Sequence, residues 1–279
     1  MSAASSSEKI TIPQLHQMKR DGRKIVGVVA WDYQMARIVD QAGVDIISVG
    51  DTVGINLWGH ATPLEVTLEE MILVCKAVRR GTKRALLSCD FPFGTLQEGI
   101  DSAVRAAIRI VKEAGADIIK LDGAADYPEA VTAIARAGIP VFAQFGLTPQ
   151  TAMAFGLQYN AMNKPGAELA ASMAAKMVEE AKLLEDAGAS LLDFTNSGAV
   201  AGEAVTRAAK LPVIGGFGGG PWLDGRMRMA HAAIGYSAAA LDATGDNYAN
   251  ISKIALEAIS NYAADVRAGN HVRGQAPTK

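Results

Sequence analysis

The sequence predicts a single-domain α/β protein, a (β/α)8 TIM barrel. Seven short apolar runs, most of which end in a polar or glycine-rich tip, alternate with alanine-rich stretches of helical spacing. An Ala-Gly pair precedes four of these runs, as expected where a helix ends at a glycine and a buried strand follows. Strands that alternate with helices at this period form parallel βαβ units. At least seven such units without a break in composition favour a closed barrel over a doubly wound sheet.

The chain begins with a polar tail, residues 1–8, and the barrel is expected to occupy residues 9–266. Residues 9–20 are predicted to form a short amphipathic helix, because Thr11 can cap it and Pro13 fits its first turn. We expect this helix either to plug the bottom of the barrel or to pack outside it.

The predicted strands follow in order along the chain. The first is expected within residues 24–32, and later ones within 45–51, 84–90 and 117–123 and from residues 141, 191 and 213 onward. The eighth strand has the weakest pattern, and its candidate is residues 227–234. A final helix over 251–266 and a polar tail over 267–279 complete the chain. Two long loops, 52–67 and 148–165, are expected to cover or gate a site.

The composition is that of an ordinary globular enzyme, with 279 residues, of which 49% are hydrophobic and 20% charged. The net charge of -2 gives no electrostatic reason to expect nucleic acid or an anionic membrane as a partner. Cys75 and Cys89 make no disulfide framework, and Cys89 is expected to be a buried small hydrophobe. Because no apolar run approaches the length of a membrane span and no signal core is present, we expect a cytoplasmic protein.

Two aspartates end neighbouring predicted strands. Asp51 and Asp90 should therefore meet at the mouth of the barrel, where the carboxyl ends of the strands carry the chemistry. Two carboxylates with open water positions suit Mg²⁺, which prefers hard oxygen ligands. The alternative is that each aspartate only caps the following helix.

Lys120 and Asp122 lie two residues apart on the next strand and so share a face, which we expect to point inward. Asp122 would join Asp51 and Asp90 as a third candidate metal ligand. Lys120 could hold a substrate carboxylate or an oxyanion, form a Schiff base as in class I aldolases, or make only a buried ion pair with Asp122.

Other features carry weaker predictions. The glycine-rich segment 215–221 stands where barrels often bind phosphate, but a tight turn is an equal alternative. His60, in the first long loop, is expected to be structural or solvated. The sequence contains no nucleophile elbow, zinc-ligand spacing, Walker loop or basic groove.

At these motifs the sequence resembles the ketopantoate hydroxymethyltransferase (3-methyl-2-oxobutanoate hydroxymethyltransferase) family, from about Ile10 to Gly235. The segments that carry the resemblance are Ala30–Tyr33, Val49–Gly54, Gly59–His60, Ala77–Gly81, Asp90–Phe93, Lys120–Gly123, Gly146–Gln150 and Pro212–Gly215. The resemblance implies a barrel of the isocitrate lyase and phosphoenolpyruvate mutase group. It also implies Mg²⁺ chelation of a 2-oxo acid, removal of the α-proton, and addition of the enolate to a one-carbon unit from methylenetetrahydrofolate. Family members assemble as multimers, often decamers, so a homo-oligomer is expected.

The resemblance also implies roles for individual residues. Asp51 and Asp90 would be metal ligands, and Asp90 and Lys120 would bind substrate. Thr52 stands where the family has a serine that contacts the substrate carboxylate, and Asp122 stands where it has a glutamate.

Two departures from the family pattern fall in the base half of the site. Gln144 replaces a histidine, and Thr195 replaces the glutamate proposed as general base. A threonine hydroxyl cannot take a carbon-bound proton at neutral pH without a base of its own. Asp193 shares the face of Thr195 one layer deeper and could act through water. Gln144 and Thr195 are then expected to contact substrate.

The sequence thus predicts a metal-dependent transferase that moves a one-carbon hydroxymethyl unit to a 2-oxo acid enolate, with Lys120, Asp122 and Asp193 as catalytic residues. The first alternative is a metal-dependent lyase or aldolase that cleaves a 2-oxo or 2-hydroxy acid, with Asp122 as base on a hydroxyl. The second is a non-catalytic relative that binds a metabolite. The metal among Mg²⁺, Mn²⁺ and Co²⁺ stays open.

Overall fold

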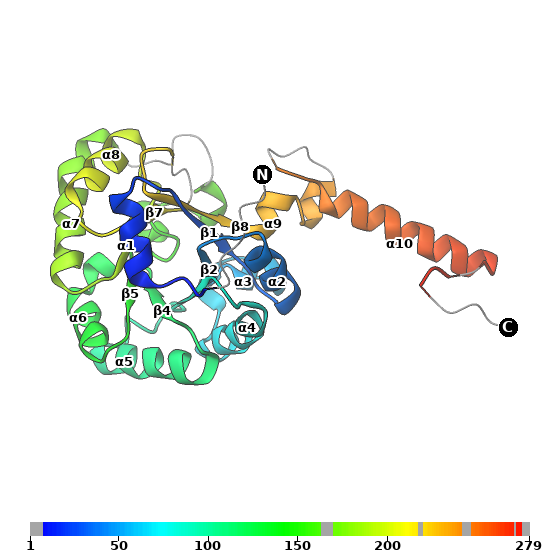
Figure 1. Cartoon of the computed structure of the whole chain (residues 1–279), viewed down its shortest axis with the longest axis horizontal. Coiled ribbons are helices and arrows are strands. Elements are labelled where there is room, and N and C mark those ends of the chain that lie inside the picture. Colours follow the sequence, from blue (N-terminus) through cyan, green and yellow to red (C-terminus); the bar gives the residue numbers. More distant parts are fainter. Residues whose placement is uncertain (1–7, 163–169, 217–219, 242–246, 271, 275–279) are drawn as a thin grey trace. The chain divides into compact units, whose positions relative to one another are not determined.

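Eight parallel strands close into a barrel in sequence order, which confirms the predicted fold class (Figure 1). The structure is a computed structural model that describes residues 8–162, 170–216, 220–241, 247–270 and 272–274. The strands are β1 Ile25–Val29, β2 Ile46–Val49, β3 Leu86–Asp90, β4 Ile118–Leu121, β5 Val141–Gly146, β6 Leu191–Thr195, β7 Val213–Gly215 and β8 Gly225–Met229. The chain divides into two compact units, residues 1–228 and residues 229–279, and each is described by itself.

Helices follow the strands as predicted. They are α2 Tyr33–Gln41, α4 Leu68–Gly81, α5 Ile100–Arg109 with the π-helical turn η2 Ile110–Ala114, α6 Pro128–Arg136, the 3-10 turn η6 Ala171–Met173 before α7 Ala174–Asp186, and α8 Ala199–Ala208. The glycines of the four Ala-Gly pairs all have φ between 74° and 96°. This left-handed conformation favours glycine and turns each chain segment from helix to strand.

The N-terminal helix α1 Ile12–Arg20 plugs the bottom of the barrel, which decides between the two predicted positions. Thr11 caps it in a reciprocal arrangement with the side chain of Gln14. Leu15 and Met18 are buried with Ile10 in one cluster that includes an apolar residue from each of the eight strands; the strand members are Ile25, Ile46, Leu86, Ile118, Phe142, Leu191, Ile214 and Met227. Figure 1 shows α1, in dark blue, inside the ring of outer helices.

The two long loops carry structure of their own. The first holds α3 Val53–Leu57 and the 3-10 turn η1 Pro63–Glu65, and the second holds the turns η4 Ala152–Phe155 and η5 Tyr159–Ala161. In the second loop, Leu147, Ala152 and Met162 form a small apolar cluster against Leu157 and Tyr159. A further turn, η3 Ala124–Asp126, follows β4.

The predicted position of the eighth strand was partly wrong. The strand is Gly225–Met229, and residues 230–234 form the short helix α9 instead of continuing it. The prediction began too late because Arg226 and Arg228 interrupt the apolar pattern of the strand. The strand begins at Gly225, where a Cβ would lie 2.3 Å from the carbonyl oxygen of Ile25. The glycine therefore belongs to the strand, where only it allows this close approach to β1.

The second unit contains α9 Ala230–Ile234, the turn η7 Ala238–Leu241 and the long helix α10 Ile251–Ala268. The predicted final helix is confirmed, and it continues two residues into the segment predicted as a polar tail. Among the helices in the described part of the chain, none is long and apolar enough to cross a membrane.

The plug leads to a prediction about stability. Because Leu15 is fully buried in the cluster under the barrel, we expect Leu15→Ala to lower the free energy of unfolding by about 2–5 kcal/mol, measured by chemical denaturation. Leu73→Ala removes the same atoms from a residue that is 65% exposed, and it should cost far less. Equal losses in the two variants would argue against the plug as a stabilising element.

Candidate active site at the mouth of the barrel

Four aspartates and one lysine gather at the carboxyl ends of β2, β3, β4 and β6. Asp51, Asp90, Lys120, Asp122 and Asp193 are all buried, as the sequence predicted for a convergent acidic site. Asp122 directly follows β4, and Asp51 lies two residues after the end of β2, whereas the other three residues belong to strands. The parallel register sets Asp90 opposite Lys120 on adjacent strands, so the barrel itself brings them together.

The ammonium group of Lys120 lies between two carboxylates. Its Nζ is 3.1 Å from Asp90 Oδ2 and 3.1 Å from Asp193 Oδ2. Burial opposes the lysine charge, but the surrounding carboxylates, with Asp90 the strongest, raise the pKa of Lys120 above its usual range. Lys120 is therefore held as a cation, which disfavours the Schiff-base alternative because that chemistry needs a neutral amine.

Asp51 and Asp90 form a pair of buried acids. Burial, and then the charge of Asp90, raises the pKa of Asp51 to about 7, and burial also raises the pKa of Asp90. The hydroxyl of Ser48 donates to Asp90 Oδ1 at 3.2 Å. A Cβ at Gly50 would lie 3.0 Å from Thr52 Oγ1 and 3.7 Å from Asp90 Oδ2, so the glycine leaves this side of the pair open.

These residues fit a hard divalent cation. Two buried carboxylates whose pKa values are both raised are a donor set that such a cation would stabilise. Within the described ranges, no group of three or more His, Cys, Asp or Glu side chains could hold a metal ion. The protein would thus supply Asp51 and Asp90, with water or substrate oxygens completing the shell, as is usual for Mg²⁺. The ligand role predicted for Asp122 stays a prediction.

Asp122 is a buried acid with one unpaired oxygen. Its Oδ2 accepts a hydrogen bond from the backbone nitrogen of Gln150 at 3.2 Å, while Oδ1 has no partner among the residues that the structure describes. Burial, and then the charge of Asp51, raises the pKa of Asp122 to about 8. An acid with a pKa near neutrality can exchange protons at the pH of a cell.

Gln150 is a site residue that the sequence pattern did not single out. Its side-chain amide donates to Asp51 Oδ2 and to the backbone oxygen of Phe91, both at 2.9 Å. Together with its bond to Asp122, it ties the second long loop to the ends of β2, β3 and β4. The only signal in the sequence was its place at the end of the Gly146–Gln150 segment. In the same loop, burial and then the charge of Asp51 raise the pKa of Tyr159.

The two residues that depart from the family pattern contact one another. Gln144 on β5 donates from Nε2 to Thr195 Oγ1 on β6 at 2.8 Å, and both are buried. In the part of the chain that is described, Oδ1 of Asp193 has no hydrogen-bond partner. The base half of the site is thus a neutral amide–hydroxyl pair above a carboxylate that is bound to Lys120.

The remaining predicted features lie outside this group. His60 is partly buried and stacks on Trp58, with ring centroids 6.1 Å apart. Cys89 is fully buried, as expected. Residues 217–219 of the glycine-rich segment lie outside the described residues, so its predicted phosphate role stays a prediction. Beside them, a Cβ at Gly220 would collide with the ring of Trp222.

The raised pKa of Asp122 predicts a pH-dependent stability. Its folded pKa of about 8 exceeds the ordinary value of 3.8, so its contribution is fully present below about pH 4 and is lost as the pH rises through 8. Relative to wild type, Asp122→Asn should therefore gain melting temperature between about pH 5 and pH 9, measured without divalent cations. Asp101→Asn, at an exposed aspartate, is the control. A difference between wild type and Asp122→Asn that does not change with pH would contradict this account.

The fold is shared with enzymes of known structure. A phosphonomutase-like protein from Burkholderia cenocepacia J2315, described as putative, aligns with a TM-score of 0.61 at 16% identity over 92% of this chain and 98% of that one. A 2,3-dimethylmalate lyase, described as a PEP mutase/isocitrate lyase superfamily member, aligns with a TM-score of 0.58 at 14% identity over 97% and 92% of the chains. At these identities the likeness shows the fold alone.

Sequence comparison gives the family. The family model described as ketopantoate hydroxymethyltransferase matches residues 9–272. The 3-methyl-2-oxobutanoate hydroxymethyltransferase of Cyanothece sp. is 40% identical over 261 residues, 92% of this chain and 96% of that protein. The enzyme of the same name from Cytophaga hutchinsonii is 38% identical over 268 residues, 96% of each. The chain therefore belongs to the ketopantoate hydroxymethyltransferase family, as the motifs in its sequence predicted.

Proposed function

We propose that this protein transfers a hydroxymethyl group to the enolate of a 2-oxo acid, with 3-methyl-2-oxobutanoate as acceptor and methylenetetrahydrofolate as donor. The observation that carries the proposal is the buried carboxylate pair, Asp51 and Asp90, beside the cationic Lys120. This arrangement suits a small anion that carries both a carboxylate and a neighbouring carbonyl oxygen. The names of the family relatives supply the identity of the acceptor.

Asp51 and Asp90 would hold a divalent cation, Mg²⁺ in the first instance. Such a cation would draw electrons from the 2-oxo group and make the adjacent C–H bond more acidic. Lys120 adds a fixed positive charge next to the same carboxylates, where it can bind the substrate carboxylate or the negative charge that develops on the carbonyl oxygen. Thr52 lies on the open side of the carboxylate pair, where its hydroxyl can donate to the substrate.

Asp122 is the proton acceptor in this proposal. Its pKa of about 8 is close to the optimum for a base that works at neutral pH, and its Oδ1 makes no hydrogen bond to any described residue. Asp193 instead positions Lys120 through their ion pair. In this proposal Asp122 acts on the substrate as the base, whereas Asp193 acts only through Lys120.

Gln144 and Thr195 take a binding role in the proposal. Neither can remove a carbon-bound proton, and their mutual hydrogen bond fixes one donor and one acceptor at the inner wall of the mouth. A neutral wall at this place would contact the substrate without adding a further negative charge to four aspartates.

The reaction balances with one water molecule. The proton on the α-carbon goes to the base, and the resulting enolate carbon forms a bond to the one-carbon unit. The two bonds between that carbon and the donor nitrogens break, water supplies the product hydroxyl group, and the donor nitrogens receive two protons in total.

The proposal also covers oligomeric state and cellular location. We propose a homo-oligomer, such as a decamer, that works in the cytoplasm. Helix α10 supports assembly because it exposes large apolar side chains, which water disfavours; they are Ile254, Leu256, Ile259, Tyr262 and Val266. Analytical ultracentrifugation of the full chain would give the number of copies.

The first test is α-proton exchange. We expect the protein with Mg²⁺ to exchange the α-proton of 3-methyl-2-oxobutanoate in D₂O, followed by NMR, and Asp51→Ala to abolish the exchange. Absence of exchange in a sample shown to bind Mg²⁺ would contradict the proposal. It would favour the lyase or aldolase alternative, which a screen of 2-oxo and 2-hydroxy acids for cleavage would then examine.

The two aspartates assigned to catalysis should respond differently. Asp122→Asn removes the proposed base and should slow exchange by about 10²–10⁴-fold. Asp193→Asn loosens Lys120 and should slow exchange by only about 10–100-fold, with a raised KM for the 2-oxo acid. The opposite order of effects would transfer the role of base to Asp193.

A further inference from the structure

The tip of β6 has a strained backbone. Asn196, the residue after the strand, has a φ of 52°, and it is the only non-glycine residue in the described ranges with a positive φ. This left-handed conformation crowds a side chain against the following carbonyl group and costs free energy, although asparagine tolerates it better than most residues. Because Asn196 is buried, this conformation persists only if neighbouring groups of the protein fix it.

The end of β5 supplies one set of contacts. The side-chain amide of Asn196 donates to the backbone oxygen of Leu147 at 3.3 Å, and the backbone nitrogen of Leu147 donates to the backbone oxygen of Thr195 at 3.3 Å. Next to them, Phe145 stacks on Phe194, with ring centroids 4.6 Å apart and planes 10° from parallel. These contacts hold β6 against β5 on both sides of Thr195.

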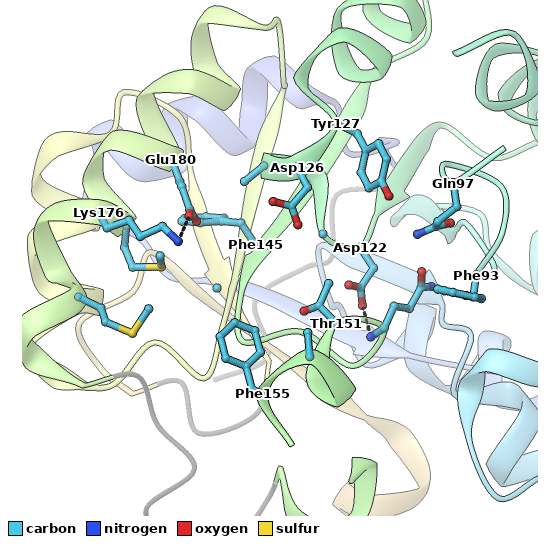
Figure 2. A pocket seen from close by; sticks show the side chains of 17 residues that line it. Phe93, Gln97, Asp122, Asp126, Tyr127, Phe145, Thr151, Phe155, Lys176 and Glu180 are labelled. Carbon is cyan, nitrogen blue, oxygen red and sulfur yellow. Dashed lines mark hydrogen bonds and ion pairs between the residues drawn. The ribbon is translucent and has the colours of Figure 1, made fainter. Parts of the chain in front are cut away.

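The two faces of this strand pair differ in polarity. Phe145 faces outward, where it lines a cavity of about 360 Å³ that Asp122 and Glu180 of α7 also line (Figure 2). Since side chains alternate along a strand, Gln144 faces the barrel interior together with its partner Thr195. The amide–hydroxyl pair is thus the inner face of strands whose outer face is aromatic.

A tryptophan from a distant part of the chain supplies a further contact. Trp222 lies between β7 and β8, and its indole Nε1 donates to the hydroxyl of Ser197 at 3.0 Å. Ser197 is fully buried, so its hydroxyl is shielded from water. The indole is seated against α8 at a glycine, because a Cβ at Gly202 would lie 2.2 Å from the Cδ1 and Nε1 atoms of the ring. The residue after Asn196 is therefore fixed by a side chain that belongs to neither β5 nor β6.

We propose that Trp222 is a positioning residue of the active site. Its bond to Ser197 holds Asn196 in the strained conformation. The fixed tip in turn aims the hydroxyl of Thr195 at Gln144 and at the substrate. The proposal rests on the function proposed above, in which these two wall residues bind the 2-oxo acid. Trp222 acts through the tip and needs no contact of its own with the substrate.

The need for such positioning follows from the neutral character of the wall. A charged side chain attracts its partner with little dependence on angle, whereas a neutral hydrogen bond weakens steeply when donor and acceptor are misaligned. Thr195 has a single hydroxyl to share between Gln144 and the substrate. A small rotation of the β6 tip would therefore weaken substrate binding, while Lys120 and its carboxylates would stay in place.

Kinetics of α-proton exchange from 3-methyl-2-oxobutanoate, with Mg²⁺ and the full chain, test the proposal. Trp222→Phe keeps an aromatic ring but removes the donor, and Ser197→Ala removes the acceptor. We expect each variant to raise KM about five- to tenfold, the effect of one lost hydrogen bond, and to change kcat by less than about twofold. Because both variants remove the same bond, the double variant should have the KM of a single one rather than the product of the two effects.

Asn196→Gly tests the strained residue itself. Glycine adopts a positive φ without strain, so this variant should fold, and the freer tip should raise KM in the same way. Ser102→Ala is the matched control, since it removes a hydroxyl that donates to Glu98 at 2.9 Å in the first turn of α5. The control should exchange the proton as wild type does. Thermal melts of each variant establish that it is folded.

Two results would overturn the proposal: an unchanged KM in Trp222→Phe and Ser197→Ala, or a lower kcat at unchanged KM, which is the result of losing folded protein. Calorimetry with Mg²⁺ and the same acid separates this proposal from the proposed function. Binding without exchange would reject the enolate chemistry, and the dissociation constants of the variants would then decide the role of Trp222 in place of KM. Exchange with equal KM in all variants would reject only that role, and a wild type that neither binds nor exchanges would reject both proposals.

Discussion

The ion pairs of Lys120 hold the mouth of the barrel together. One buried ammonium group bridges a carboxylate on β3 and another on β6, and it comes from β4, so three strands meet at a single charge. Within the described site, that charge faces four aspartates. Burial, and then the charge of a neighbouring aspartate, raises the pKa values of Asp51, Asp90 and Asp122. A site with more carboxylates than cationic groups is suited to a divalent cation, which offsets their negative charge. The bound cation and Lys120 together would then attract an anionic substrate.

The scaffold keeps these charges in place from below and from above. Below, α1 fills the end of the barrel opposite the site with apolar side chains that belong to one cluster with a residue from every strand. Above, the second long loop packs on its own small cluster and reaches Asp51 and Asp122 through Gln150. The charged layer is therefore enclosed between an apolar plug and a structured loop, which strengthens its electrostatic interactions by excluding water.

The departures from the family pattern have a common physical result. Gln144 and Thr195 satisfy each other with one hydrogen bond, so neither remains as an unpaired buried group. The carboxylate of β6 stands at residue 193, two positions before Thr195, and binds Lys120. Compared with the family pattern, β6 therefore still carries a carboxylate, but that carboxylate lies deeper in the barrel than the position of Thr195.

The barrel and most of its acidic site follow from local patterns in the chain. Alternating strands and helices, separated by glycines that must adopt positive φ, leave few other folds, and a carboxylate at the end of a parallel strand must face the mouth. For the same reason Asp51, Asp90, Lys120 and Asp122 could be grouped correctly from their positions along the sequence.

Contacts between segments that are far apart in the chain became visible only in the folded molecule. The strand of Gly225 was misplaced because its close approach to β1 leaves no local pattern. The position of α1, the role of Gln150 and the partner of Asp193 each depend on distances across the barrel, which spacing along one strand cannot give. The cavity beside Asp122 is likewise made by residues from four separate parts of the chain, and no single segment of sequence encodes it.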